Sequence, residues 1–207
     1  MHSDSILNKV ETHALSFLRK IFPDDRHYHN LTHTLEVVNV SAEIATAEKM
    51  NADEIEIIKI AAWFHDLGYL CCCEGHEEQS SFYAREFLVK ESYPSDKIDM
   101  VVGCINATKV PQSPSNKMEE ILCDADLHHF GLIDSEERGE LLRQEIELKG
   151  IKKFTELEWL KTSAAFLKQH QYFTDYAKHK YNSQKKINIG ILEKKVSRIE
   201  ENRNPKT

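Results

Sequence analysis

Glycine and proline are scarce in this sequence, which has 7 glycines and 5 prolines among 207 residues. These two residue types mark most tight turns, so their scarcity disfavours a fold of many short strands. Apolar residues recur instead at helical spacing, for example at Val10, Ala14, Phe17 and Ile21. The sequence therefore predicts an all-α protein.

Long apolar runs are absent as well. No stretch of about 18 apolar residues occurs, so we expect no membrane-spanning helix and no membrane partner. The N-terminal residues lack the basic and apolar regions of a signal peptide, and the cytoplasm is the expected location.

The chain has few cysteines, and their number is odd. The chain has 5, and Cys71, Cys72 and Cys73 are consecutive. An odd count in a chain of this length does not fit a secreted disulfide framework. Adjacent cysteines also lack the spacing of a zinc ribbon, so we expect reduced thiols that bind no metal.

An excess of positive charge is missing too. Lys and Arg number 27 against 34 Asp and Glu, which gives a formal net charge of −7. The basic residues between Lys178 and Lys195 are followed by Glu200 and Glu201, with Glu193 among them, and are typical of a solvated helix face. We therefore expect no nucleic acid polymer as a partner.

Turn residues and capping patterns divide the chain into helices. Asp53 is an expected N-cap, and Asp134 with Glu137 and Thr155 with Glu158 are expected capping boxes. We find no repeat, low-complexity tract or linker, and predict one domain over residues 1–207. The expected helices cover about 5–21, 35–50, 53–68, 77–90, 94–107, 118–130, 136–149, 155–170 and most of the remainder to about 200.

Histidines and carboxylates gather in three places. The groups are His29 with His33, His65 with Asp66, and Asp124, Asp126, His128 and His129 together. Imidazole and carboxylate are ligands that suit Mn, Fe, Co, Ni or Zn. Each group alone also fits a structural role, such as an ion pair or cap at a helix end. The ordered combination of all three favours a metal site.

This order, His then His-Asp then Asp, resembles the HD superfamily of metal-dependent phosphohydrolases. The resemblance extends over about residues 25–175 and implies a single HD-domain helical bundle, with additional C-terminal helices at about 176–203. Its motifs are Tyr28-His29-Asn30-x-x-His33, Ala61-Ala62-Trp63-Phe64-His65-Asp66-Leu67-Gly68-Tyr69 and Asp124-Ala125-Asp126-Leu127, with further pieces at Gly75-His76-Glu77, Ile105-Asn106-Ala107-Thr108-Lys109 and His170-Gln171-Tyr172-Phe173-Thr174.

The resemblance implies a ligand set for the metal. His33, His65, Asp66 and Asp126 match the ligand positions, and Asp124 is assigned to support around them. We expect one divalent ion per chain, drawn from Mn, Fe, Co, Ni, Zn or Mg. A second ion is less expected, because Asn106 and Thr108 stand where dinuclear members carry a further histidine.

The resemblance also implies catalytic roles. His29 matches a histidine that protonates the leaving oxygen, although it could instead hydrogen-bond a neighbouring helix. His76 and Glu77 could orient the attacking water or contact a second ion. Lys109 could neutralise phosphate charge or be simply solvated.

The implied substrate is a small phosphorylated molecule, most naturally a nucleotide, whose phosphate ester is hydrolysed. The Glu-Asp pair of alarmone hydrolases is replaced by Leu67-Gly68-Tyr69, which disfavours guanosine tetraphosphate. The alternatives are a weakly active or non-catalytic sensor module that binds a nucleotide or metal, and an iron oxygenase, which needs more histidines. The sequence leaves open whether the chain forms a homodimer.

Overall fold

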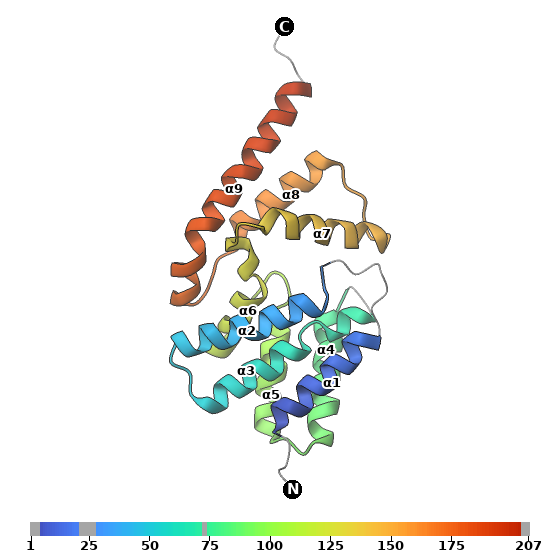
Figure 1. Ribbon diagram of the computed structural model, residues 1–207, viewed down its shortest axis with the longest axis vertical. Coiled ribbons are helices and arrows are strands. Elements are labelled where there is room, and N and C mark those ends of the chain that lie inside the picture. The colour runs from blue at the N-terminus through green and yellow to red at the C-terminus, as the bar shows by residue number, and fades with distance from the viewer. Residues whose placement is uncertain (1–4, 21–27, 72–73, 204–207) are drawn as a thin grey trace.

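The computed structural model describes residues 5–20, 28–71 and 74–203. It confirms the all-α prediction: these residues contain helices and no strand (Figure 1). The α-helices are α1 (Ile6–Lys20), α2 (Leu31–Ala47), α3 (Ala52–Phe64), α4 (His76–Lys90), α5 (Ser95–Ala107), α6 (Lys117–Asp126), α7 (Ser135–Leu148), α8 (Glu156–Gln169) and α9 (Asp175–Arg203), with short 3₁₀ helices η1 (Leu67–Leu70) and η2 (His128–Gly131).

Helix α3 lies at the centre of the bundle formed by α1–α6. It contacts α1, α2, α4, α5 and α6. Its last five residues, from Ile60 to Phe64, are all apolar and buried. A helix that is apolar all round is stable only where other helices surround it. The end of α3 is therefore held rigidly inside the bundle.

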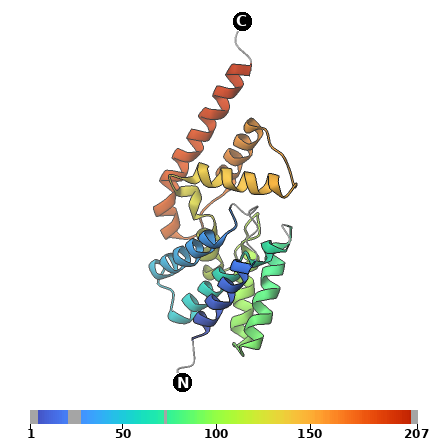
Figure 2. The same ribbon diagram turned by 45° about the vertical axis from the view of Figure 1, so that its right-hand side comes forward.

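A second, smaller apolar cluster joins α8, α9 and η2. It is built around Phe130, Leu160, Leu167 and Leu192. Figures 1 and 2 show α8 and α9 beyond the α1–α6 bundle, with α7 between the two parts. Helix α7 contacts η2.

Helix ends follow the capping rules with two corrections. Thr155 and Glu158 form the expected capping box. At α3 the cap is Asn51, which forms a box with Glu54, and not Asp53. Asp134 precedes α7 but makes no side-chain cap bond, because its carboxylate accepts a hydrogen bond from Arg138 Nε at 2.9 Å.

The described helices include none with the length and apolar character that crossing a membrane requires.

Candidate metal centre

The His65-Asp66 pair lies where α3 stops. We expected this helix to continue to Gly68 with both residues in its last turn, and that was wrong: α3 ends at Phe64 and the tighter helix η1 begins at Leu67. Neighbouring residues of a regular helix point about 100° apart. The break at Asp66 (φ −108°, ψ 3°) brings Asp66 Oδ2 to 3.1 Å from His65 Nε2.

Close packing of η1 on α4 accompanies this break. A Cβ atom at Gly68 would lie 2.1 Å from the carbonyl oxygen of His76 and 2.6 Å from the backbone nitrogen of Ser80. Gly68 N also donates a hydrogen bond to Ser80 Oγ at 2.8 Å. Glycine is required here for close approach, and the approach places His76 Nε2 3.6 Å from Asp66 Oδ1.

His33 and Asp126 complete the group from two other helices. His33 lies in the first turn of α2, where its backbone N–H donates to the capping side chain of Asn30. Its Nε2 lies 3.2 Å from Asp66 Oδ2 and 3.3 Å from Asp126 Oδ1. Asp126 is the last residue of α6, and its Oδ1 lies 3.7 Å from His65 Nε2. The four residues named from the sequence therefore meet at one point.

The donor atoms at this point fit a cation. His65 Nδ1 donates to the carbonyl oxygen of Ala62 at 2.7 Å, which directs Nε2 inward as a potential ligand. The Nε2 atoms of His33 and His65 face each other at 3.4 Å. Asp66 Oδ2 is buried and accepts no hydrogen bond within the described part of the chain. A divalent metal ion would satisfy these inward-facing atoms together, and His33, His65 and Asp66 form a group that could hold one.

The electrostatics of the group point the same way. Burial alone lowers the pKa of an imidazole, but the carboxylates of Asp66 and Asp126 outweigh burial and raise the pKa values of His33 and His65. Despite their burial, Asp66 and Asp126 have lowered pKa values, through His65 and His33 at both carboxylates and through the charge of His29 at Asp66 as well. The paired carboxylates thus favour positive charge, which a proton or a metal ion can supply.

His29 approaches the centre from outside the helix that carries His33. We expected this helix to begin at about residue 35, but α2 begins at Leu31, so it includes His33 and leaves out His29. His29 Nδ1 donates to Glu145 Oε1 at 2.7 Å, and its ring stacks on Tyr69 with centroids 3.9 Å apart. The ring centroids of His29 and His33 are 6.0 Å apart.

Glu145 is the residue that the sequence did not reveal. This glutamate of α7 has 0% relative exposure, and its Oε2 accepts the backbone N–H groups of Tyr28 and His29, each at 2.9 Å. Burial would raise its pKa, but the hydrogen bond and charge of His29, with the two backbone donors, lower it to about 2. Nothing in the sequence distinguishes Glu145 from the other glutamates of its helix.

The three remaining expected catalytic residues have different surroundings. Glu77 is buried, with Oε1 3.5 Å from His76 Nε2, so this pair lies beside Asp66. Lys109 is exposed, and its Nζ pairs with Glu78 Oε1 at 2.5 Å. The structure therefore brings His76 and Glu77 to the centre but leaves Lys109 on the surface.

Asp124 does not support the metal ligands as expected. It lies two residues before Asp126, on the opposite side of α6, and it is fully buried. Its carboxylate accepts hydrogen bonds from Phe173 N, Thr174 N and Thr174 Oγ1 at 2.7–2.8 Å. These hydrogen bonds of Asp124 therefore connect α6 to the segment that leads into α9.

The other histidines and cysteines near the centre have local partners. His128 Nδ1 donates to the carbonyl oxygen of Ala125, and His129 lies 3.0 Å from the Tyr28 hydroxyl. Cys71 is exposed and free, with Sγ 3.0 Å from the Tyr83 hydroxyl. Cys72 and Cys73 lie outside the described residues.

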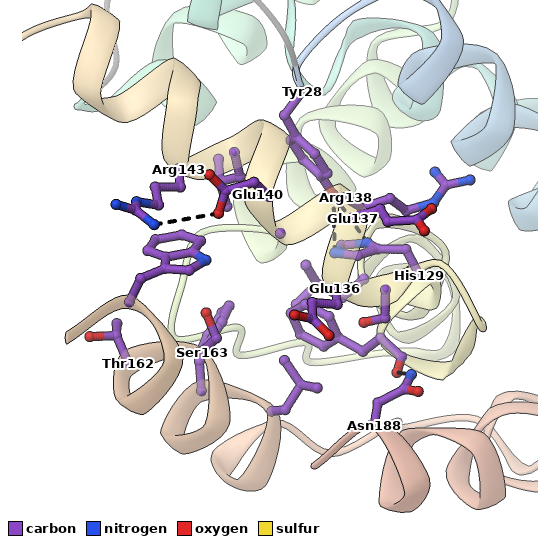
Figure 3. A pocket seen from close by; sticks show the side chains of 18 of the residues that line it. Tyr28, His129, Glu136, Glu137, Arg138, Glu140, Arg143, Thr162, Ser163 and Asn188 are labelled. Atoms are coloured by element: carbon purple, nitrogen blue, oxygen red, sulfur yellow. Dashed lines mark hydrogen bonds and ion pairs between the residues drawn. The ribbon is translucent and has the colours of Figure 1, made fainter. Parts of the chain in front are cut away.

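The centre opens into a cavity of about 970 Å³. Asp66, Asp126, His29, His76 and Glu77 line its inner end. The cavity continues between α7 and α8 toward α9, as Figure 3 shows through Arg143, Ser163 and Asn188. A small molecule can therefore reach the two carboxylates from this side.

Comparisons with known proteins support this fold. The family model of the HD domain matches residues 30–153, more than half of the chain. A solved structure of a predicted HD superfamily hydrolase from an uncultured Thermotogales bacterium is 18% identical, with 90% of this chain and 91% of that chain covered and a TM-score of 0.59. A solved structure of a Lactobacillus plantarum protein is 17% identical, with 97% of each chain covered and a TM-score of 0.64. A search of the curated proteins finds no match.

Proposed function

The chain belongs to the HD domain family, and from this premise we propose that it is a metal-dependent hydrolase acting on the phosphate ester of a nucleotide or related small molecule. The solved structure of a hydrolase with the same fold supports hydrolysis in general. The choice of a phosphate ester rests on the resemblance to the HD phosphohydrolases and on the chemistry of the site.

One observation carries the proposal: two imidazoles and two carboxylates from α2, α6 and the turn after α3 converge beside an open cavity. Their facing atoms lie 3.1–3.7 Å apart, and Asp66 Oδ2 is buried with no hydrogen bond from any described residue. Bound by His33, His65, Asp66 and Asp126, one divalent cation would supply Lewis-acid polarisation of a phosphoryl oxygen and a lowered pKa for water. Phosphoryl transfer depends chiefly on such positioning and charge stabilisation.

In the proposal, His29 supplies a proton. In hydrolysis the bond from phosphorus to the alcohol oxygen breaks, a bond from phosphorus to the water oxygen forms, and the leaving oxygen takes up a proton. Since Nδ1 of His29 donates to Glu145, the proton that passes to the leaving oxygen is the Nε2–H of the imidazolium form, which leaves a neutral ring protonated on Nδ1. His29 lines the cavity next to the centre, where a substrate phosphate would lie.

His76 and Glu77 lie beside Asp66, and the ring centroids of His76 and His29 are 6.3 Å apart. His76 Nε2 lies 3.6 Å from Asp66 Oδ1, on the other oxygen from the one that faces His33 and His65. Both residues line the cavity. In the proposal they orient the attacking water against the phosphate.

The test is a reconstitution of the whole chain. Metal-stripped protein is loaded in turn with Mn, Fe, Co, Ni, Zn or Mg and assayed for phosphate release from nucleoside monophosphates and for cleavage of nucleotide phosphodiesters. We expect turnover with at least one metal, and its loss in His65→Ala together with the bound ion. Stoichiometric metal binding and nucleotide binding without turnover of any ester would replace the proposal by the sensor alternative.

A further inference from the structure

Adjacent sides of α7 have different environments. Glu145 contacts His29, while Leu142 and Ile146, about 60° and about 100° away from it around the helix, line the cavity. Leu142 and Ile146 are only partly buried and belong to neither apolar cluster, although they line the cavity. An apolar helix face is normally packed against a neighbouring element. Here α7 faces α8 across a cleft.

The walls of this cleft are mostly apolar. In Figure 3, Arg143 and Glu140 on α7 lie above Thr162 and Ser163 on α8, with Asn188 of α9 below. Aromatic and aliphatic side chains line the space between them: Phe130, Trp159, Phe166, Leu142, Ile146 and Leu160. Aromatic walls with a few hydroxyl groups suit a ligand that is largely apolar or planar.

The charges along the cleft argue against a second phosphate there. The basic side chains are already paired: Arg143 Nε with Glu147 at 2.9 Å, Lys195 with Glu136, and Arg138 with carboxylates of α2 and of the turn before α7. Further carboxylates line the same space. A ligand group placed in the cleft is therefore expected to carry no additional negative charge.

The cleft and the metal centre are one cavity. Asp66 and Asp126 line its inner end, and Phe166 and Trp159 line its other part. An ester whose phosphate lies at the carboxylates and histidines must direct its alcohol portion toward these aromatic side chains. The placement of the phosphate at the metal centre rests on the proposed function, whereas the apolar lining of the cleft does not.

We propose that the cleft between α7 and α8 binds the alcohol portion of the substrate, and that this portion is large, uncharged and apolar or aromatic. Substrates are then monoesters with a ring system or comparable apolar group, and small polar alcohol phosphates and polyphosphates are poor substrates. Specificity arises from α7 and α8, while the α1–α6 bundle provides the ligands that the phosphate approaches.

Two glycines offer a matched pair of variants. Gly139 lies within α7 and lines the cavity, and a Cβ atom built there meets nothing within 4 Å. Gly190 lies within α9, also meets nothing within 4 Å, and is not among the lining residues. Replacing either by leucine raises helix propensity, so both variants should fold. Gly139→Leu fills the cleft, and Gly190→Leu adds the same side chain elsewhere.

The experiment uses the full chain and two readouts. The first is kcat/KM of the metal-loaded protein for phenyl phosphate and 1-naphthyl phosphate, whose leaving groups are similar in chemistry but differ in apolar area. The second is binding of 1-naphthol, followed by its fluorescence in metal-loaded protein and in His65→Ala. We expect naphthyl phosphate to be favoured about tenfold, from the extra apolar area buried. Gly139→Leu should remove this preference and weaken naphthol binding about tenfold or more, while Gly190→Leu should match the unaltered chain.

The outcomes separate this inference from the proposed function. If no ester is hydrolysed but naphthol binds and only Gly139→Leu weakens it, the proposed function fails and the cleft stands as an apolar ligand site. If esters are hydrolysed with equal kcat/KM, or if the two glycine variants behave alike, or if naphthol does not bind, the inference is overturned. A fall in molar mass by light scattering in Gly139→Leu alone would assign the cleft to contact between copies of the chain, and would overturn it too.

Discussion

Nδ1 of His29 lies 2.7 Å from Oε1 of Glu145. This hydrogen bond joins the residue before the N-cap of α2 to α7, a helix that begins more than a hundred residues later. The carboxylate is buried and also accepts the backbone N–H groups of Tyr28 and His29. The ring of His29 is thereby fixed in orientation, with one proton held on Nδ1 and with Nε2 directed away from Glu145, so the imidazolium form carries the Nε2 proton that can be donated. This contact links α7, which forms one wall of the cleft, to the proposed proton donor.

His29 and His33 should respond differently to replacement. His33→Ala should lose both the bound metal and turnover, because His33 Nε2 faces both carboxylates of the centre. His29→Ala should keep the metal while kcat falls by roughly 10²-fold or more, the usual scale for a lost general acid. Metal content by elemental analysis and steady-state kinetics check both. Normal turnover in His29→Ala, or loss of its metal, contradicts the assigned role.

Glu145→Gln tests whether the carboxylate acts through His29. Glutamine has similar volume, but its amide does not restrict Nδ1 of His29 to the role of donor. We expect kcat to fall about tenfold with KM and metal content nearly unchanged. In a His29→Ala background the same substitution should have no further effect on kcat, as a double-mutant cycle measures. Equal losses in both backgrounds would indicate a purely structural role for Glu145.

The same carboxylate predicts a pH dependence of stability. The pKa of Glu145 is lowered in the folded chain from its ordinary value of 4.5 to about 2. A lowered pKa stabilises the fold above about pH 4.5, and this contribution is lost as the pH falls toward 2. In metal-free protein, Glu145→Gln should lower the free energy of unfolding by about 2 kcal/mol at neutral pH, the scale of a hydrogen bond to a charged group. The difference should shrink as denaturation is measured at lower pH, and a constant difference would contradict the assignment.

The cysteines that follow the metal residues should be dispensable for the ion. Cys71 is exposed, and its sulfur contacts the Tyr83 hydroxyl at 3.0 Å. Replacing Cys71, Cys72 and Cys73 together by serine should leave the number of ions per chain unchanged in elemental analysis. Loss of the ion would mean that a thiolate contributes to the site.

Local sequence patterns predicted most of the fold because helices are local structures. The Thr155–Glu158 box and the apolar spacing of α3 required only neighbouring residues. The predicted end of α3 was wrong because Gly68 was interpreted as the residue that stops the helix. The structure shows that this glycine is required where η1 approaches α4, a contact between segments that spacing alone does not reveal.

The site was predictable only where residues form motifs. His33 and His65 were found through their order in the chain, and the structure brings them together with the two aspartates. Glu145 is a single residue on a glutamate-rich helix, and its burial depends on where α7 packs. Lys109 was considered as a group that neutralises phosphate charge because it ends a motif piece that contains Asn106. Its amino group instead pairs with Glu78 on α4. The cleft depends on the distance between α7 and α8 in the fold, which no local sequence pattern predicts.

Asp124 and Asp126 provide the sharpest test of the metal centre, since they differ by two positions on the same helix. Asp126 Oδ1 faces His33 and His65, whereas Asp124 accepts three hydrogen bonds from residues 173 and 174. Asp126→Asn should therefore lose most of the bound metal and of the turnover. Asp124→Asn should keep the metal and lower the free energy of unfolding by about 1–3 kcal/mol, because a buried acceptor of three donors is weakened.

Measurements on this pair belong at about pH 8. Burial raises the pKa of Asp124 to about 6, opposed by its three hydrogen bonds, so above that pH the comparison is between a carboxylate and an amide. Metal titration by calorimetry and denaturation of the metal-free proteins give the two readouts separately. If Asp124→Asn loses the ion while Asp126→Asn retains it, the ligand assignment on α6 is reversed. If both retain it, α6 contributes no ligand and the centre consists of His33, His65 and Asp66 alone.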